Sequence, residues 1–229
     1  IASYAALAAI AIQSNQNDQH GGQSIPNFDY GMAEGVSKTF FRAYRRCLSE
    51  AVEDKLDLDD AKEAVTEAMD AAKEATGEQA RLENGPAYDR AVVAALCGTF
   101  ALSGKDAAKI IARARKRAVE AKDRDTYQAM EGFVHNLNTM HSRAGAQTPF
   151  SSINYGTDVS PEGRMVIRNI LLALDAGLGH GETCIFPIHI FKVKEGINYN
   201  PQDPNYDLFR LSCKVSARRL FPNYVFLDS

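Results

Sequence analysis

The segment SRAGAQTPFSSINYGTD, from Ser142 to Asp158, has the residue types best suited to binding a polar ligand. Gln147 to Tyr155 has the length and composition of a strand. A strand that mixes Ser and Asn with large apolar residues can present hydroxyl and amide groups on one face while its other face packs. Such a face suits hydrogen bonds to a sugar or a base. The alternative is a strand whose polar residues only face solvent, and the residue types leave both open.

A basic helix is predicted over Ala33 to Glu53, because its apolar residues recur at helical spacing. The apolar set is Val36, Phe40, Phe41, Tyr44 and Leu48, and the remaining faces carry Lys38, Arg42, Arg45 and Arg46. An arginine suits a phosphate group because its planar guanidinium can donate two parallel hydrogen bonds. The alternative is a basic face that only contacts solvent.

The charge balance argues against a nucleic-acid or membrane partner. The chain has 26 basic and 29 acidic residues, which give a net charge of -3. A second basic run, Lys105 to Lys122, is flanked by Asp106 and Glu120 and is typical of a solvated helix face. We therefore expect any anion site to be local.

Standard catalytic and metal-binding motifs are missing from the sequence. There is no P-loop, HExxH or GxSxG motif, and the glycines of residues 177–181 lack the spacing of a dinucleotide fingerprint. His135 and His141 point in different directions on a predicted helix, and His189 lies in an apolar strand, as a core histidine does. The cysteines form no CxxC pair, which favours buried thiols over metal ligands or disulfides. We expect no metal site.

The elements that position these groups change in character near residue 141. Residues 1–141 are predicted to be mainly helical, whereas residues 142–229 alternate strand and helix. In the second part, a helix begins at Ser160-Pro161-Glu162 and ends at Gly177, and a mostly apolar strand follows over Thr183 to Val193. The strand, helix and second strand predict a crossover unit in a parallel or mixed α/β sheet. No linker divides the chain, so we predict a single region over residues 1–229.

The 229 residues have the 45% hydrophobic content of an ordinary globular protein. The apolar run from Ile1 to Ile12 lacks the flanks of a signal peptide and is too short to span a bilayer, so a cytoplasmic location is expected. The chain starts at Ile1 rather than at a methionine, and it stops directly after the apolar residues 224–227. We therefore expect it to be a piece of a larger protein.

Five motifs, in order along the chain, resemble the anaerobic, glycyl-radical ribonucleoside-triphosphate reductases. Besides residues 142–158 they are QHGGQSIPNFDYGMA (Gln19 to Ala33), SPEGRM (Ser160 to Met165), GLGHGET with IFPIHIFKVKEGIN (Gly177 to Asn198), and DPNYDLF through SARRLFPN (Asp203 to Asn223). Residues 54–125 carry little of this resemblance. The resemblance implies a ten-stranded α/β barrel, of which this chain would form the helix-rich amino-terminal half.

The resemblance also implies radical reduction of ribonucleoside triphosphates to deoxyribonucleoside triphosphates. In the family, an iron-sulfur, S-adenosylmethionine-dependent activase places a radical on a glycine; the radical passes to a finger-loop cysteine, which abstracts the ribose 3′ hydrogen. The 2′ hydroxyl is then lost, and formate or a thiol system supplies electrons. The residues around Cys47, Cys97, Cys184 and Cys213 do not match the family's catalytic cysteines, and Cys184 stands where relatives usually carry proline. We assign no catalytic residue to this chain.

The site residues implied by the resemblance fall into two groups. Gln147, Ser151, Ser152 and Asn154 are candidates for the barrel face nearest the substrate. Because side chains alternate along a strand, only some of them can point inward, and the sequence does not decide which ones do.

The second group concerns a deoxynucleotide or ATP effector, which the family binds at the interface of a homodimer. The corresponding helices are Ile1 to Gln16 and Ala33 to Glu53. The resemblance puts the effector phosphate at Arg42, with Lys38 one turn earlier, and the effector base at Asn136. Two alternatives are kept: a catalytically inactive nucleotide-binding and dimerisation module, and another glycyl-radical enzyme such as a formate-lyase relative.

Overall fold

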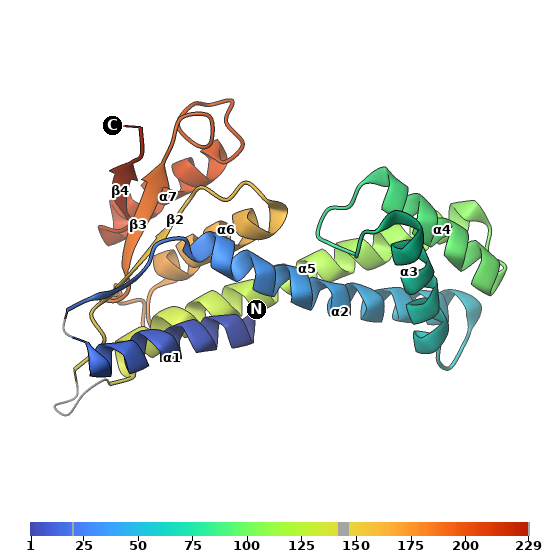
Figure 1. The fold of residues 1–229 in the computed structure, drawn as a ribbon, viewed down its shortest axis with the longest axis horizontal. Coiled ribbons are helices and arrows are strands. Elements are labelled where there is room, and N and C mark those ends of the chain that lie inside the picture. Colours follow the sequence, from blue (N-terminus) through green and yellow to red (C-terminus); the bar gives the residue numbers. More distant parts are fainter. Residues whose placement is uncertain (20, 142–146, 229) are drawn as a thin grey trace. The chain divides into compact units, whose positions relative to one another are not determined.

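A computed structural model describes residues 1–19, 21–141 and 147–228, so residues 142–146 of the first motif and His20 of another lie outside the described residues. The described part contains seven helices and four strands (Figure 1). In chain order they are α1 (Ala2–Asp18), β1 (Gln23–Ile25), α2 (Phe28–Leu56), α3 (Lys62–Thr76), α4 (Pro86–Phe100), α5 (Gly104–Thr139), β2 (Ser151–Tyr155), α6 (Pro161–Ala176), β3 (Ile188–Val193), α7 (Tyr206–Arg219) and β4 (Asn223–Phe226).

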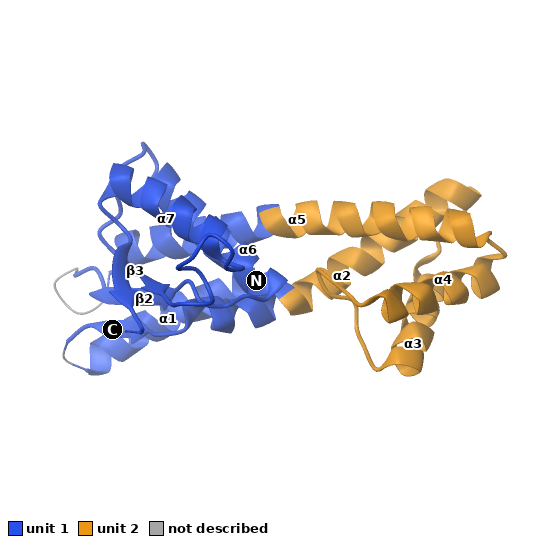
Figure 2. Cartoon of the chain, turned by 90° about the horizontal axis from the view of Figure 1, so that it is seen from above, with its two compact units in different colours: residues 1–36, 124–229 blue, residues 37–123 orange. Residues whose placement is uncertain are grey.

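The chain forms two compact units (Figure 2). Unit 1 contains residues 1–36 and 124–229, and unit 2 contains residues 37–123. All four strands belong to unit 1, whereas α3 and α4 belong to unit 2. The prediction that residues 1–229 act as a single region stays a prediction.

The four strands make one parallel sheet in the order β1-β2-β3-β4. The α/β class and the parallel crossover between β2 and β3 are thus confirmed. Strand β1 was not predicted, because three residues next to a proline are too short to show alternation.

The two faces of the sheet differ in burial. Ile153 and Tyr155 of β2 lie in register with His189 and Phe191 of β3, and all four side chains are buried. Helix α7 packs against this face through Phe209, whose ring centroid lies 6.2 Å from that of Phe191. The opposite face is half-buried; it carries Ser152, Asn154, Ile188, Ile190 and Lys192.

Local sequence signals account well for α6 and less well for the long helices. The Ser160 Oγ accepts a hydrogen bond from the Gly163 amide at 3.0 Å, as expected of an N-cap, and the helix ends at Gly177 with φ of 81°. Helix α2 begins at Phe28, earlier than predicted. Helix α5 continues to Thr139, although the prediction ended the basic helix at Lys122.

Unit 2 is organised around the guanidinium of Arg115. It donates hydrogen bonds to the Arg81 carbonyl at 2.6 Å and to the Asp89 carboxylate at 2.7 Å, and it lies 5.1 Å from the centre of the Tyr44 ring. Burial raises the pKa of Tyr44, and it raises the pKa of Tyr88 to about 12. Both phenols are therefore neutral at physiological pH. Within the described ranges, no single helix has the length and apolar composition to cross a bilayer.

Candidate functional site

The side chains of β2 alternate between the two faces of the sheet, so the candidate substrate residues are divided between these faces. Ser152 and Asn154 lie on the half-buried face of the sheet, whereas Ser151 lies on the buried face and donates its hydroxyl hydrogen bond to the Pro149 carbonyl at 3.1 Å. Gln147 precedes the strand and is exposed. The structure therefore brings Ser152 and Asn154 together and points Ser151 away from them.

Asn154 has an unusual hydrogen-bonding state. Its side-chain carbonyl Oδ1 is buried and has no hydrogen-bond partner among the described residues. A buried acceptor without a donor costs free energy, and most such atoms in folded proteins are paired with protein or water. The Asn154 amide can therefore accept a hydrogen bond from a hydroxyl or amino group of a bound molecule.

The segment that follows β2 is held by three buried polar side chains. The Asp29 Oδ2 accepts hydrogen bonds from the amides of Gly156, Thr157 and Asp158 at 2.9, 3.0 and 3.0 Å. Two asparagines bind the carbonyls of the same segment: Asn198 donates to Gly156 at 2.9 Å, and Asn205 donates to Asp158 at 2.9 Å. These contacts fix the carboxyl end of the strand that carries Asn154. Sequence analysis missed them, because the partners are distant along the chain.

The candidate effector residues lie on two helices. Lys38 and Arg42 are exposed residues of α2 in unit 2, and Asn136 is a half-buried residue of α5 in unit 1. Arg42 lines a groove of about 350 Å³ with residues of α2 and α3, and Lys38 is not among the lining residues. No side-chain hydrogen bond of Asn136 occurs within the described part of the chain.

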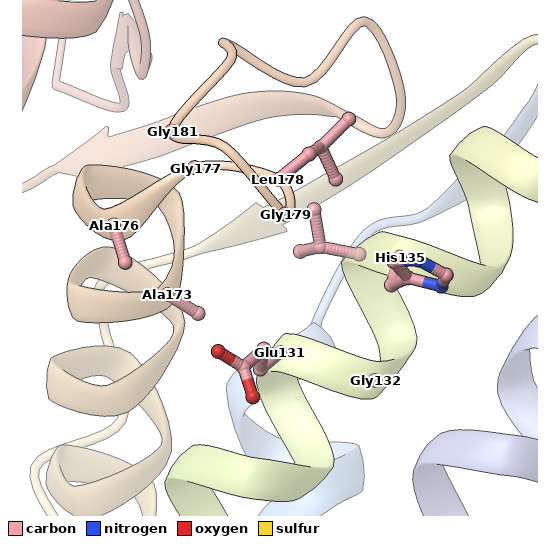
Figure 3. Close-up of a pocket in the computed structure, with 10 residues that line it drawn as sticks. Glu131, Gly132, His135, Ala173, Ala176, Gly177, Leu178, Gly179 and Gly181 are labelled. Carbon is pink, nitrogen blue, oxygen red and sulfur yellow. The ribbon is translucent and has the colours of Figure 1, made fainter.

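Unit 1 also contains a cavity of about 360 Å³ beside the glycine-rich turn of residues 177–181. Glu131 and His135, one turn apart on α5, line it together with Ala173 and Ala176 of α6 (Figure 3). Figure 3 shows the Glu131 carboxylate directed from α5 toward α6. Sequence analysis singled out neither side chain as a cavity residue; the cluster of glycines was the available signal, because backbone without side chains leaves open space.

The buried face of the sheet holds neutral ionisable groups. The Tyr155 hydroxyl lies 3.1 Å from His189 Nδ1. Burial lowers the pKa of His189 to about 3 and raises that of Cys184 to about 11. The prediction of a core histidine at position 189 is confirmed as to burial, although its Nε2 has no hydrogen-bond partner among the described residues.

A family model described as "Anaerobic ribonucleoside-triphosphate reductase" matches residues 1–228. The chain belongs to this family. The resemblance read from the five motifs is therefore confirmed.

Two curated anaerobic ribonucleoside-triphosphate reductases illustrate the similarity. The protein from Enterobacteria phage T4 is 36% identical over 129 residues, which are 56% of this chain and 21% of the phage protein. The protein from Escherichia coli (strain K12) is 33% identical over 106 residues, which are 46% of this chain and 15% of the bacterial protein. The matches thus span about a fifth or less of the length of these reductases.

The four cysteines of this chain form no metal-binding group within the described residues. Cys47 and Cys184 are buried, Cys97 is half-buried and Cys213 is exposed, and all four are free thiols. Across residues 1–19, 21–141 and 147–228, no three His, Cys, Asp or Glu side chains are grouped so that they could hold a metal ion. The raised pKa of Cys184 keeps its thiol protonated, and a protonated thiol is a poor nucleophile.

Proposed function

We propose that this chain is part of an enzyme that reduces ribonucleoside triphosphates to deoxyribonucleoside triphosphates by radical chemistry. In this proposal, the two units serve as one region of the catalytic chain, the amino-terminal half of a ten-stranded barrel. The observation that carries the proposal is the unpaired Asn154 carbonyl on the half-buried face of a parallel strand. Membership of the family supports it.

The substrate wall is the half-buried face of β2. Ser152 and Asn154 supply a hydroxyl and an amide there, which suit the hydroxyl groups of a ribose. Helix α7 covers the opposite face of the sheet, which is where a barrel carries its helices. Ser151 belongs to that opposite face, and we propose a role in packing for it. Gln147 remains a candidate ahead of the strand.

The radical chemistry needs groups that we place outside this chain. In the family, a glycyl radical supplies the one-electron chemistry, and an iron-sulfur, S-adenosylmethionine-dependent activase installs it. A relay cysteine has to contact the substrate, whereas Cys184 is buried in unit 1 and Cys47 is buried in unit 2. We therefore propose that this chain binds and orients substrate and that other segments perform the hydrogen abstraction.

The helices α1 and α2 are proposed to form a homodimer interface that binds a dNTP or ATP effector. Arg42 and Lys38 would contact the phosphates, and Asn136 would contact the base. The exposed positions of Lys38 and Arg42, and the Asn136 amide without a hydrogen bond within the described residues, support these roles.

Substitutions on the two opposite faces of β2 test the proposed substrate wall. In the complete reductase, activated by its activase, Asn154→Ala and Ser152→Ala should each lower kcat/KM about tenfold, because each removes one hydrogen bond to the substrate. Ser151→Ala is the matched control on the opposite face, and its kcat/KM should change less than about twofold. A larger effect at Ser151 than at Ser152 and Asn154 would overturn the proposed wall.

The activity of the complete protein distinguishes the enzyme from an inactive binding module. The isolated 229-residue chain should form no deoxynucleotide in either case, even with activase, whereas the complete reductase should form it. If the complete protein is inactive with every ribonucleoside triphosphate but binds dATP or dTTP, the binding-module alternative holds. If it produces another glycyl-radical product, such as one of formate-lyase chemistry, the reductase proposal is wrong.

A further inference from the structure

The cavity between α5, α6 and the turn of residues 177–181 shares no lining residue with the proposed substrate wall or the proposed effector site. Its volume of about 360 Å³ is within the range of small-molecule sites. Four of its ten lining residues are glycines and two are alanines, so few side chains fill it. All ten belong to unit 1, and one compact unit therefore contains the whole cavity.

The glycine turn of the cavity is fixed to α7. Gly177 has a φ of 81°, and a Cβ there would lie 2.6 Å from the Glu182 carbonyl oxygen, so this turn requires glycine. Arg219 of α7 donates to the Ala176 carbonyl at 3.1 Å and to the Gly181 carbonyl at 2.6 Å. One guanidinium thus holds both ends of the turn, and it does so without lining the cavity itself.

The segment that follows the turn is bound to α5. The Asn138 Oδ1 accepts hydrogen bonds from the amides of Ile185 and Phe186 at 2.9 and 3.1 Å. Glu131 and His135 precede Asn138 by about two turns and one turn of the same helix. Because the walls are held together in this way, a ligand would lose little of its binding free energy in ordering the cavity.

The Glu131 carboxylate has no counter-ion. Among the described residues its side chain accepts one hydrogen bond, from the Tyr127 hydroxyl at 3.4 Å, and forms no ion pair. Figure 3 shows this carboxylate directed from α5 toward α6. A carboxylate can only accept hydrogen bonds, so the α5 wall of the cavity attracts a cation that carries N–H donors.

The glycine turn also offers acceptors. The Leu178 amide donates to the Glu182 carbonyl at 2.8 Å, and the His180 amide donates to the Glu182 carboxylate at 2.9 Å. The carbonyls of Gly177 and Gly179, by contrast, accept no hydrogen bond within the described part of the chain. They lie beside the carboxyl end of α6, where the helix dipole is negative. A cationic donor therefore suits this second wall as well.

The surface between the two walls is aliphatic. Val134, Ala173, Ala176 and Leu178 line it, and the imidazole of His135 is the one ring in the lining. A metal ion fits poorly, because the described residues include no group of three His, Cys, Asp or Glu side chains that could hold one. A chain of methylene groups with an ammonium group at each end matches both the acceptors and the aliphatic surface.

We propose that this cavity binds an aliphatic diamine or polyamine. One ammonium group binds the Glu131 carboxylate, a second binds the carbonyls of Gly177 and Gly179, and the methylene chain lies along Ala173 and Leu178. This ligand is neither the proposed substrate nor the proposed effector, so the site goes beyond the proposed function and does not depend on it. A bound diamine connects α5 to the turn that leads to β3.

Calorimetric titration of the complete protein, free of nucleotides, with 1,4-diaminobutane tests the site. Glu131→Gln keeps the shape of the side chain but removes its charge, and it should weaken binding about tenfold. Glu120→Gln is the matched control, because it removes the same charge from an exposed position of α5 outside the cavity, and it should leave the affinity unchanged. Added salt should weaken the binding, since the attraction is electrostatic.

A variant that fills the cavity separates this site from a general attraction between charges. A Cβ at Gly179 would meet no atom within 4 Å, so Gly179→Leu can fill the cavity without a backbone clash. It should abolish diamine binding and keep the melting temperature of the free protein within about 2 °C of the parent. The neutral analogue 1,4-butanediol has the same chain length and should show no binding.

Several outcomes would overturn this proposal. Three concern the diamine: no saturable binding, equal losses in Glu120→Gln and Glu131→Gln, or unchanged binding in Gly179→Leu. If 1,4-butanediol binds as tightly as the diamine, the cavity selects an apolar chain rather than a cation. If potassium ions displace the diamine at equal concentration, the cavity is an inorganic cation site. If Gly179→Leu weakens dATP binding as much as diamine binding, the cavity belongs to a nucleotide.

Discussion

Asp29 in the first turn of α2 is joined to Gly156 at the end of β2 by a hydrogen bond of 2.9 Å from the Gly156 amide to the Asp29 Oδ2. The same oxygen accepts from the next two amides, and the Asp29 side chain is completely buried. One carboxylate thus satisfies three consecutive backbone donors. It ties the start of a helix to the strand of the proposed substrate wall.

Asp29→Ala should destabilise unit 1 by about 3 kcal/mol or more, because three buried amides lose their acceptor. Hydrogen exchange of the amides of Gly156, Thr157 and Asp158, followed with urea unfolding, measures the effect. Asp18→Ala, an exposed residue at the end of α1, is the matched control and should change stability by less than about 0.5 kcal/mol. Equal protection of the three amides in Asp29→Ala and the parent would contradict the assigned role.

His189 makes the stability of the sheet depend on pH. Burial holds its pKa at about 3, below the ordinary value of 6.5, so between these values the unfolded chain binds a proton that the folded chain does not. Its contribution to stability is complete above about pH 6.5 and is lost as the pH falls toward 3, with a slope of about 1.4 kcal/mol per pH unit.

Urea unfolding at several pH values from 7 to 4.5 measures this slope. The double variant Tyr155→Phe, His189→Leu removes both members of the buried pair and leaves neither group unpaired, so its slope should be shallower than that of the parent. His135→Gln, which changes an exposed histidine, should keep the parent's slope. An unchanged slope in the double variant would show that other groups cause the acid sensitivity.

Arg115 should be the most sensitive charged residue of unit 2. Its guanidinium contacts the Arg81 carbonyl, the Asn84 and Asp89 side chains and the Tyr44 ring at the same time. Arg115→Ala should cost about 2 to 4 kcal/mol, and Arg115→Lys should restore little, because an ammonium group cannot reproduce the planar fork of donors. Thermal unfolding monitored by exchange of α4 and α5 amides provides the measurement. Lys116→Ala, which changes an exposed neighbour, is the control. A loss of stability in this variant as large as that in Arg115→Ala would refute the prediction.

The elements predicted correctly are those whose signals are local. The Ser160 cap, the Gly177 end of α6 and the apolar stripe of α2 each depend on residues that are near one another in the sequence, so the sequence displays them directly. The end of the basic helix was misplaced because the charged residues near Asp123 weaken the helical pattern, although burial of Met130, Phe133 and Leu137 continues the helix beyond them.

The candidate site was predictable only in part, because its contacts join distant segments. The sequence identified a polar strand here, but a serine falls on each of its faces. Which face the buried core covers could therefore be decided only from the neighbouring strands. The role of Asp29 could not be foreseen, since it depends on a partner segment that no periodicity reveals.

Gly163 illustrates how tightly α6 is packed against the segment held by Asp29. A Cβ at this position would lie 2.1 Å from the Asp158 Cγ, and Asp158 cannot withdraw easily, because its amide binds Asp29 and its Oδ1 accepts from the Ser160 amide at 2.8 Å. Gly163→Ala should therefore destabilise the chain by about 1 to 3 kcal/mol, although alanine is the better helix former.

Gly98 in α4 is the matched control, because it is also helical and a Cβ there would meet no atom within 4 Å. Gly98→Ala should raise stability by about 0.5 to 1 kcal/mol through the lower entropy of the unfolded chain. If the contact with Asp158 causes the destabilisation, thermal melting should show a lower melting temperature than the parent for Gly163→Ala and a higher one for Gly98→Ala. If both substitutions stabilise the chain, Asp158 yields more readily than its hydrogen bonds indicate, and the segment after β2 is not held rigidly by Asp29.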